Sequence, residues 1–310
     1  MIELSVIIPT HNPNAKRLER TLDGLKAQTL SAERWETVVV DNASSTPVSL
    51  SEFADFTPSN LRIVKESTLG LTSARHRGFL ETKAPLIVLV DDDNVLAPNY
   101  LENAMRHFSK NERVGAMGGR CFPEFETKPE PWIREFDDLL ALRDPGDAPK
   151  FSGPLHDKQT GRASYPFCAP VGAGMALRRA GISSWLAEVD PTKISDRRGN
   201  KLTSGGDNDL IVHLMKEGWE TAYFPDLLLT HLIPAGRIRV DYLARLNEGI
   251  QESWMRLLSQ HSMNPWPPIS KWSAPFRKMK SWFTFQAWSS PAHYIRWRGT
   301  CGHFAGRITK

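Results

Sequence analysis

Three consecutive carboxylates, Asp91, Asp92 and Asp93, follow directly on the apolar run at residues 85–90. Adjacent anions repel one another, so we expect a cation or a set of hydroxyl groups to meet them. Mg²⁺ and Mn²⁺ prefer oxygen ligands, and Mg²⁺ is usually held by one or two carboxylates together with substrate phosphates. The triplet therefore indicates a metal-bridged phosphate ligand, and the alternative is a solvated turn ahead of Pro98.

An alternation of strands and helices is predicted to place this triplet at the edge of a sheet. Apolar runs predict strands at residues 4–8, 37–40, 61–64 and 85–90. Leucine spacing predicts a helix at residues 15–28, and a second helix is expected at residues 71–81. Near-continuous apolar strands separated by helices indicate an α/β fold with a mostly parallel sheet covered on both faces. Ligands bind beyond the carboxyl ends of such strands. The polar clusters at 10–12, 41–45 and 91–93 all fall there.

The second half of the chain has a less regular pattern. After a predicted strand at 114–119, residues 120–170 are rich in Pro, Gly and charge, and we expect short helices there, the best candidate being 132–142, that form a wall over the site. Gly174 lies in a run of small residues that would let the backbone approach a bulky ligand. A helix at 207–216 and a strand at 220–224 follow.

Composition limits the class of protein. The chain has 310 residues, 40% of them hydrophobic, which suffices for a large core. No stretch approaches the roughly 20 apolar residues of a membrane-spanning helix, and the N-terminus lacks a signal-peptide pattern. Three widely spaced cysteines support neither a disulfide framework nor a CxxC metal site. We therefore expect a soluble protein in a reducing cytoplasm.

The C-terminal segment is basic and rich in tryptophan. The net charge is +4, yet no Asp or Glu follows Glu252, whereas six of the ten tryptophans and nine Lys or Arg residues do. Aromatic rings interleaved with cations suit a surface that lies against anionic lipid headgroups. The main alternative is an aromatic cap on the preceding domain. Nucleic acid could use the same mixture of rings and cations, but we do not expect it as a partner.

Six motifs occur in the order typical of one enzyme family. They are Ser5–Asn12, Val39–Ser44, Gly70–Gly78, Leu89–Asp93, Gly205–Leu210 and His231–Pro234. With them, residues 3 to about 250 resemble family 2 glycosyltransferases with the GT-A fold. The resemblance implies a nucleotide-binding, mostly parallel sheet flanked by helices, followed by the basic, aromatic-rich C-terminal extension.

The resemblance also implies roles for single residues. Asp93 matches the metal ligand, with Mn²⁺ or Mg²⁺ as the ion, and His231 matches a histidine that contacts the metal or the diphosphate. Asp207 matches the catalytic base. Residues matching the nucleotide-sugar site are Pro9, Thr10, Asn12, Asp41, Arg75, Asp91 and Asp92, where Thr10 and Asp41 would meet the base, Arg75 the base or phosphates, and Asp92 ribose and sugar hydroxyls. Gly174 and Asp209 are expected on the acceptor side.

Each role has a plainer alternative. Asp207 could be an ordinary N-cap, since Asp is favoured at helix starts, and Gly206 stands where the family often has Glu. Asp209 is a rival base, although it lies about 200° around a helix from Asp207. His231 could be a buried, hydrogen-bonded histidine. Arg75 could be a solvated helix residue.

The predicted reaction moves a sugar from a nucleotide-diphosphate sugar to a hydroxyl of a glycan or lipid-linked acceptor. The resemblance to the family favours UDP as the nucleotide. A single base facing the donor predicts inversion at the anomeric carbon.

We expect residues 1–250 to be the catalytic domain, with 1–119 as the nucleotide-sugar half and 120–250 as the acceptor half. Residues 251–310 are expected to be the extension. An extension that holds the active site near a lipid-linked acceptor fits polysaccharide or cell-surface glycan synthesis at the inner face of the cytoplasmic membrane. The absence of GxGxxG after the first strand disfavours a dinucleotide oxidoreductase. The alternative is a non-catalytic nucleotide-sugar binder or membrane scaffold.

Overall fold

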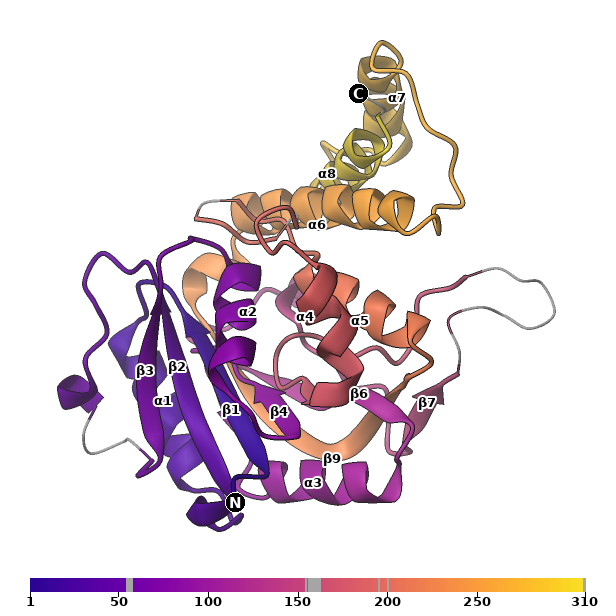
Figure 1. The fold of residues 1–310 in the computed structure, drawn as a ribbon. Helices are drawn as coiled ribbons and strands as arrows, with labels where there is room; N and C mark the ends of the chain where they lie inside the picture. The colour runs from indigo at the N-terminus through magenta and orange to yellow at the C-terminus, as the bar shows by residue number, and fades with distance from the viewer. Residues whose placement is uncertain (54–57, 154, 156–162, 195, 200, 309–310) are drawn as a thin grey trace. The chain divides into compact units, whose positions relative to one another are not determined.

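The computed structural model describes residues 1–53, 58–153, 155, 163–194, 196–199 and 201–308 (Figure 1). Its internal contacts divide the chain into two compact units, which we describe separately. Unit 1 is Met1–Glu124, Ala141–Lys193 and Leu210–Leu232; unit 2 is Phe125–Leu140, Ile194–Asp209 and Ile233–Lys310. The predicted boundary after residue 250 lies inside α6 (Val240–Gln260), so the units follow packing rather than that linear division. The functional division into domains stays a prediction.

Parallel strands form the first half of the sheet in unit 1. They are β3 (Leu61–Glu66), β2 (Trp35–Asn42), β1 (Leu4–Thr10) and β4 (Leu86–Leu89), in this spatial order. Every residue of β1 is buried, as expected for an apolar strand covered on both faces. The flanking helices α1 (Ala15–Lys26) and α2 (Leu71–Glu81) lie within the predicted ranges. The predicted α/β sheet flanked by helices is confirmed.

Antiparallel strands complete the sheet. They are β5 (Asn94–Leu96), β6 (Val114–Phe125), β7 (Lys150–Ser152), β8 (Ala176–Arg178) and β9 (Glu220–Ile233). β8 pairs with β4 and β6, whereas β5 and β7 both pair with β9. β9, which also neighbours β6, runs well past the predicted end at residue 224, and Pro225 falls between its pairings with β7 and β5. Helices α3 (Tyr100–Lys110) and α4 (Ser183–Glu188) were not predicted.

The helix predicted at 132–142 differs from the structure. It is a 3₁₀ helix, η3 (Pro131–Leu140), and Phe136 breaks its regular dihedrals with φ −120°. Ala141 then ends the segment in the left-handed conformation, with φ 57°. Part of the wall expected over the site, residues 154 and 156–162, lies outside the described residues. Shorter 3₁₀ turns occur at Ala32–Arg34, Leu50–Phe53, Arg179–Ile182 and Ala235–Ile238.

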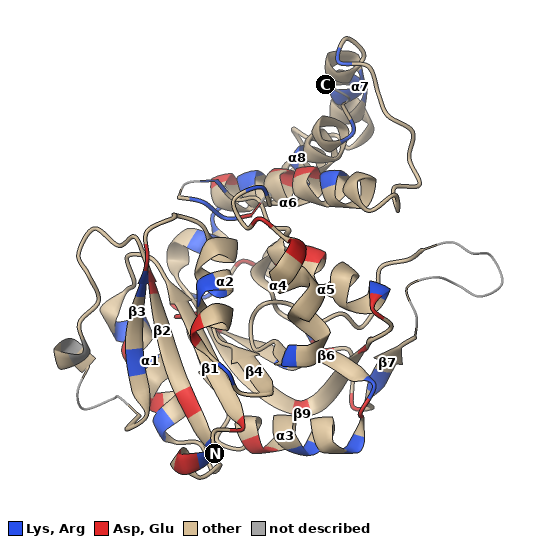
Figure 2. Ribbon diagram, viewed as in Figure 1, with Lys and Arg blue, Asp and Glu red and all other residues tan. Residues whose placement is uncertain are grey.

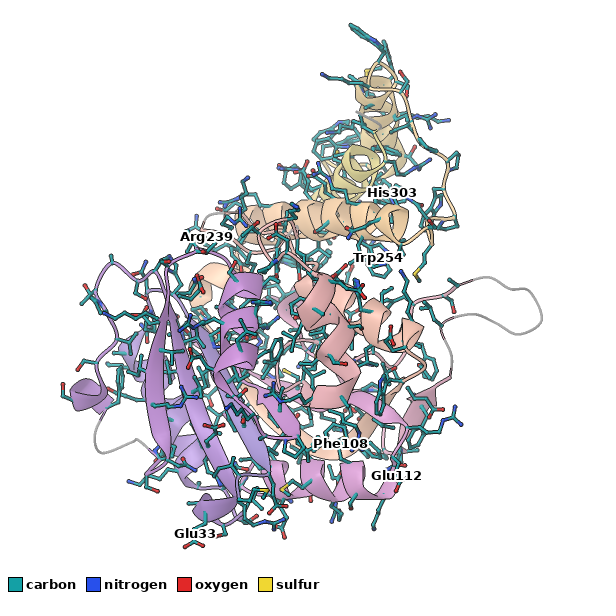
Figure 3. All side chains as sticks on the ribbon, in the orientation of Figure 1. Glu33, Phe108, Glu112, Arg239, Trp254 and His303 are labelled. Atoms are coloured by element: carbon teal, nitrogen blue, oxygen red, sulfur yellow. The ribbon has the colours of Figure 1, made fainter. Side chains whose placement is uncertain are left out.

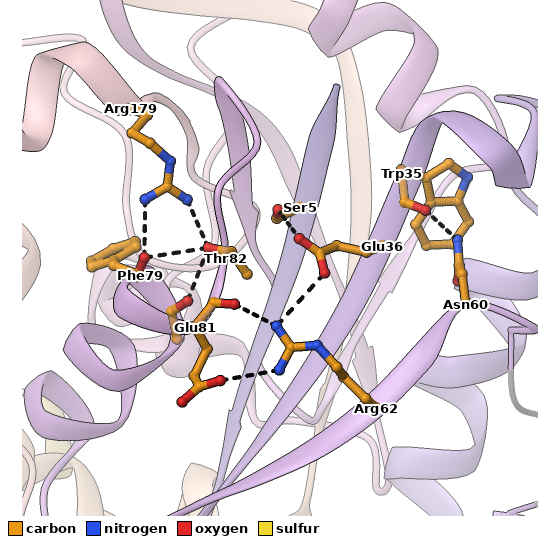
Figure 4. A network of polar contacts seen from close by, with 10 residues as sticks. Ser5, Trp35, Glu36, Asn60, Arg62, Phe79, Glu81, Thr82 and Arg179 are labelled. Carbon is orange, nitrogen blue, oxygen red and sulfur yellow. Dashed lines mark hydrogen bonds and ion pairs between the residues drawn. The ribbon is translucent and has the colours of Figure 1, made fainter. Parts of the chain in front are cut away.

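Two arginines fix the C-terminal end of α2 (Figure 4). The Arg179 guanidinium donates to the carbonyl of Phe79 at 2.9 Å and to the Thr82 hydroxyl at 2.7 Å. Arg62 bonds the carbonyl and the carboxylate of Glu81. Cations at a helix C-terminus satisfy free carbonyls and complement the helix dipole. These contacts help to fix the orientation of α2, which carries Arg75.

Unit 2 is helical. α6 packs against α8 (Pro291–Gly306), which also contacts α7 (Ala274–Thr284). The helices approach closely because α8 presents glycines along one side: a Cβ at Gly302 would lie 2.0 Å from the Glu248 carbonyl oxygen, and one at Gly306 would lie 2.4 Å from that of Glu252. Figure 2 shows acidic and basic residues on α6 but only basic ones on α7 and α8. Among the described residues no helix is long and apolar enough to cross a bilayer.

Candidate functional site

The register of unit 1 brings two predicted residues together at the carboxyl edge of the sheet. Thr10, the last residue of β1, lies beside Asp41 of β2, and both are 4% exposed. β4 pairs with β1 on the other side and leads directly into the acidic triplet. The Thr10 hydroxyl donates to the Asp92 carboxylate. One edge therefore carries Thr10, Asp41 and Asp92 from three strands, as the sequence predicts for a ligand site.

The loop after β2 is closed by the Asp41 side chain. One carboxylate oxygen accepts from the backbone N–H of Ser44 at 3.2 Å, and the other accepts from that of Val48 at 3.1 Å. Such bonds stabilise the carboxylate and fix the loop. Contact of Asp41 with a nucleotide base stays a prediction, whereas the two bonds show that its side chain closes this loop.

The first two loops are bonded to each other. Asn12, which has φ 49°, donates its backbone N–H to the Ser44 hydroxyl at 2.9 Å, and its side-chain oxygen accepts from the Ser45 N–H at 2.8 Å. The preceding Pro9 is buried within β1. These contacts give the edge of the sheet a rigid rim, while the predicted nucleotide-sugar contacts of Pro9 and Asn12 stay untested.

Asn42 is a positioning residue that was not among the predicted site residues. Its side-chain oxygen accepts from the Gly70 N–H at 2.8 Å, at the start of α2, and its amide donates to the carbonyls of Glu66 and Thr68. Its own carbonyl bonds the His11 ring at 2.8 Å. The available signal was a buried asparagine at a strand end, where a side chain with two donors and an acceptor can organise several loops.

The acidic triplet divides its contacts among three neighbours. Asp91 bonds Arg75 at 3.2 Å, and that arginine is 5% exposed, so it is not the solvated helix residue of the alternative reading. Asp92 accepts from Thr10. Asp93 accepts from the Asn94 amide at 3.2 Å. The three carboxylates therefore point to different partners, which reduces their mutual repulsion.

Strand pairing positions His231 beside Asp93. Asn94 of β5 is the register partner of His231 in β9, and the Leu232 N–H donates to the Asp93 carbonyl at 2.8 Å. The His231 Nε2 then lies 3.5 Å from the Asp93 Oδ1, and both residues are 4% exposed. Residues 138 positions apart in the chain thus form a buried carboxylate–imidazole pair.

This pair has a donor set that fits a divalent cation. Carboxylate oxygen suits Mg²⁺ and Mn²⁺, whereas imidazole nitrogen favours transition metals, so a mixed pair fits Mn²⁺ at least as well as Mg²⁺. The negative charge of the triplet also acts on Cys121 of β6. Burial, then Asp93 and Asp91, raise the pKa of that thiol to about 12.

Gly174 has a structural reason for being glycine. Its φ is +70°, and an added Cβ would lie 2.4 Å from the Leu229 side chain and 2.8 Å from the Tyr100 hydroxyl. That hydroxyl donates to the Gly174 carbonyl, and burial raises the pKa of Tyr100 above its usual value. The close approach at Gly174 is therefore to its own unit, and its predicted acceptor-side role stays untested.

Unit 2 contains the predicted base. Asp207 is half-buried in the first turn of α5 (Gly206–Lys216). Asp209, two residues on, is 1% exposed and bonds His261 Nε2 at 2.8 Å. The two carboxylates thus differ in burial as their 200° separation predicts. The pairing ties the start of α5 to the end of α6, which is a structural role for Asp209; both catalytic assignments stay predictions.

The sequence matches a known family. A model described as glycosyl transferase family 2 matches residues 5–182. The validoxylamine A glucosyltransferase of Streptomyces hygroscopicus subsp. jinggangensis is 33% identical over 158 residues, covering 48% of this chain and 36% of that protein. An N-acetylglucosaminyltransferase of Azorhizobium caulinodans is 24% identical over 239 residues, covering 75% of this chain and 55% of its own. The chain thus spans between a third and just over half of the length of these relatives.

Solved structures show the same fold. The mannosyltransferase PcManGT of Pyrobaculum calidifontis, in complex with GDP-Man and Mn²⁺, has a TM-score of 0.59 at 19% identity. The match covers 98% of this chain and 73% of the PcManGT chain. The structure of S. aureus TarS residues 1–349 has a TM-score of 0.52 at 13% identity, and the match covers 98% of this chain and 89% of the TarS chain. A second structure of the same TarS residues is in complex with UDP. At these identities the likeness concerns the fold alone. The expected GT-A fold is confirmed.

Proposed function

The chain belongs to glycosyl transferase family 2, and from that premise we propose that it transfers a sugar from a nucleotide-diphosphate sugar to a hydroxyl of a glycan or lipid-linked acceptor. The observation that carries the proposal is the convergence of Thr10, Asp92 and Asp93 at one edge of the sheet, with His231 beside the last of them. An edge with aligned hydroxyl, carboxylate and imidazole groups suits a ligand that combines sugar hydroxyls with a diphosphate.

Donor binding is assigned to unit 1. The Thr10 hydroxyl holds one oxygen of Asp92, and the rest of that carboxylate would accept hydrogen bonds from ribose and sugar hydroxyls. Arg75, held by Asp91, supplies positive charge for the phosphates. Asp93 and His231 would hold Mn²⁺ or Mg²⁺. When bound, this ion would neutralise charge on the diphosphate leaving group.

Asp207 is proposed as the general base. A carboxylate within about 3 Å of an acceptor hydroxyl can take its proton as the new glycosidic bond forms and the bond to the diphosphate breaks. Its place in the first turn of α5 and its partial exposure support this role. With one base and no covalent intermediate, the configuration at the anomeric carbon inverts.

The donor nucleotide and the acceptor are assigned by analogy. The relatives named as glucosyltransferase and N-acetylglucosaminyltransferase, and the fold neighbours that hold UDP or GDP-Man, support a nucleotide-sugar donor. We retain UDP as the proposed nucleotide. Synthesis of polysaccharide or cell-surface glycan, at the inner face of the cytoplasmic membrane, remains the proposed setting.

A donor panel tests the activity. Purified protein is mixed with UDP-, GDP- and dTDP-sugars and with Mn²⁺ or Mg²⁺, and release of nucleoside diphosphate is followed. We expect release from at least one donor, with an initial product of inverted configuration by NMR. Donor binding without any release, with every acceptor class offered, would favour the non-catalytic binder instead.

Substitution of the proposed base separates transfer from binding. Asp207→Asn is expected to lower kcat by at least about a hundredfold while donor affinity changes less than threefold, because the proton acceptor is lost but the donor contacts of unit 1 remain. The matched change Asp190→Asn removes an exposed carboxylate that bonds Thr192 and should leave kcat unaltered. Near-normal turnover of Asp207→Asn, with loss in Asp209→Asn, would move the base to Asp209.

A further inference from the structure

One face of α7 exposes large apolar side chains. Phe276, Met279 and Phe283 are 69%, 58% and 62% exposed. Their spacing of three and four residues places them on one side of a helix. Exposed apolar residues scattered singly are ordinary, whereas a continuous stripe indicates a contact surface.

The opposite face of α7 already has its partner. Ala274 and Ser281 are buried, and the Trp282 ring lies edge-on to that of Trp297 in α8, 4.7 Å between centroids. The Trp297 indole also donates to the Lys278 carbonyl at 3.1 Å. Packing of the α7–α8 pair therefore does not use the exposed stripe.

Two tryptophans extend the stripe at its ends. Trp272 precedes the helix and is 86% exposed. Trp288 follows it, is 58% exposed, and its ring lies 5.8 Å from that of Phe283. Trp266 is different, because its ring packs 5.0 Å from His303, which Figure 3 labels on α8. We call Trp272, Phe276, Met279, Phe283 and Trp288 the α7 stripe.

The charges around the stripe are all positive. Lys271, Arg277, Lys278 and Lys280 lie on or next to α7, which contains no Asp or Glu. In the part of the chain that the structure describes, no carboxylate forms an ion pair with these four cations. Arginines of α8 differ, since Arg296 pairs with Glu135 and Arg298 with Glu248.

We propose that the α7 stripe is an interfacial membrane anchor that inserts into an anionic bilayer at headgroup depth. Phe and Met side chains bury apolar area at the acyl boundary, tryptophan rings sit at the headgroup level, and the surrounding cations meet lipid phosphates. The helix has 11 residues, too few to span the bilayer, so it lies in the plane of the interface.

The charge pattern selects lipid over a second copy of the chain. A twofold contact through the stripe would bring two sets of unpaired cations together, and like charges across an interface are unfavourable. An anionic lipid surface satisfies both the cations and the apolar side chains. It would also hold the protein next to a lipid-linked acceptor, although lipid binding does not depend on the proposed reaction.

Flotation of the full-length protein with vesicles tests the anchor. We expect binding to phosphatidylcholine vesicles that contain about 30% phosphatidylglycerol, weaker binding to pure phosphatidylcholine, and weakening by salt. Phe276→Ser combined with Phe283→Ser should reduce the partition coefficient at least about tenfold. Arg277→Gln combined with Lys280→Gln should reduce binding to anionic vesicles and its salt dependence.

The matched control is Leu80→Ser, which removes an equally exposed apolar side chain from α2 in unit 1 and should bind vesicles like the wild type. Circular dichroism checks that each variant is folded. Equal vesicle binding by the stripe variant and the wild type would overturn the proposal, as would indifference to anionic lipid. A dimer in light scattering that the stripe variant abolishes, with no vesicle binding, would assign the stripe to self-association. None of these measurements needs a sugar donor.

Discussion

At the residue scale, the site depends on a few side chains that fix one another. Thr10 holds Asp92, Arg75 holds Asp91, and His231 lies beside Asp93. Each pair joins a residue of the acidic triplet to a residue of β1, α2 or β9. Replacing one member should therefore disturb the geometry of the other more than it disturbs the fold.

Thr10→Val removes only the hydroxyl that donates to Asp92. A half-buried carboxylate loses one of its hydrogen bonds, which we expect to cost about 1 kcal/mol of unfolding free energy. The KM for the donor should rise as well, since the Asp92 carboxylate is held less firmly. Urea unfolding and initial-rate kinetics measure the two effects.

The matched control is Thr37→Val in β2. Thr37 is fully buried, and its hydroxyl makes no hydrogen bond among the described residues. Its removal should leave stability equal or slightly higher. If Thr10→Val and Thr37→Val behave alike in both assays, the Thr10–Asp92 bond has no role in donor binding.

Much of the site was predictable at this scale from residue type and strand ends. Parallel strands share one carboxyl edge, so Thr10, Asp41 and Asp92 were expected together. A shared role of Asp93 and His231 was predicted only from the resemblance to the family. Their contact spans 138 residues and depends on the antiparallel register of β5 and β9, which hydrophobic periodicity does not predict. The linking role of Asn42 was missed, since its partners are backbone groups of another loop.

At the scale of elements, close packing decides several positions. The segment that enters β8 approaches α3 and β9 so closely that Gly174 has no room for a side chain. The positive φ of this residue adds backbone strain to any substitution.

Gly174→Ala is therefore expected to lower the unfolding free energy by about 2 to 4 kcal/mol. Gly146→Ala separates the two causes, because Gly146 also has a positive φ, +106°, but nothing lies within 4 Å of its Cβ position. That control should lose only about 1 kcal/mol from backbone strain. Equal losses in the two variants would show that the contact with Tyr100 and Leu229 is unimportant.

Strands and helices of the first half followed from periodicity, as did α5 and the starts of β6 and β9, whereas several other later elements did not. β5, β7 and β8 have three residues each, too short for an alternating pattern to be recognised. α3 has a clear apolar face, but it was not predicted because Asn94 and Pro98, which precede it, are typical of loops. The prediction of a family 2 glycosyltransferase is confirmed, and it came from the order of motifs rather than from any single element.

At the scale of the whole molecule, partly buried histidines couple folding to pH. His107 stacks on Phe224, 3.8 Å between ring centroids, and its Nε2 lies 2.7 Å from the Asp226 carboxylate. Burial lowers the pKa of His107 below the usual 6.5, although Asp226 acts in the opposite direction. Burial also lowers the pKa of His76 beside Trp185.

These shifts predict a loss of stability in mild acid. Because the folded-state pKa is depressed, the unfolded chain takes up protons first as the pH falls through about 6.5, which favours unfolding. The stabilisation is complete above that value and is lost toward the folded-state pKa. The slope is at most about 1.4 kcal/mol per pH unit for each histidine.

Urea unfolding between about pH 5 and pH 8 measures this dependence. His107→Gln, which can still donate to Asp226, should flatten the slope over this range. A wild-type stability that is constant or rises as the pH falls from 7 to 5.5 would contradict the assignment.

The central claim is that Asp93 takes part in holding a divalent ion that nucleotide-sugar turnover requires. The most direct measurement is nucleoside diphosphate release from the preferred donor as a function of Mn²⁺ concentration. The account predicts a saturable Mn²⁺ requirement in the wild type and in Asp23→Asn, an exposed change on α1, and at least about a hundredfold loss at every Mn²⁺ concentration in Asp93→Asn. Full turnover in the presence of a chelator, or wild-type Mn²⁺ dependence in Asp93→Asn, would contradict it.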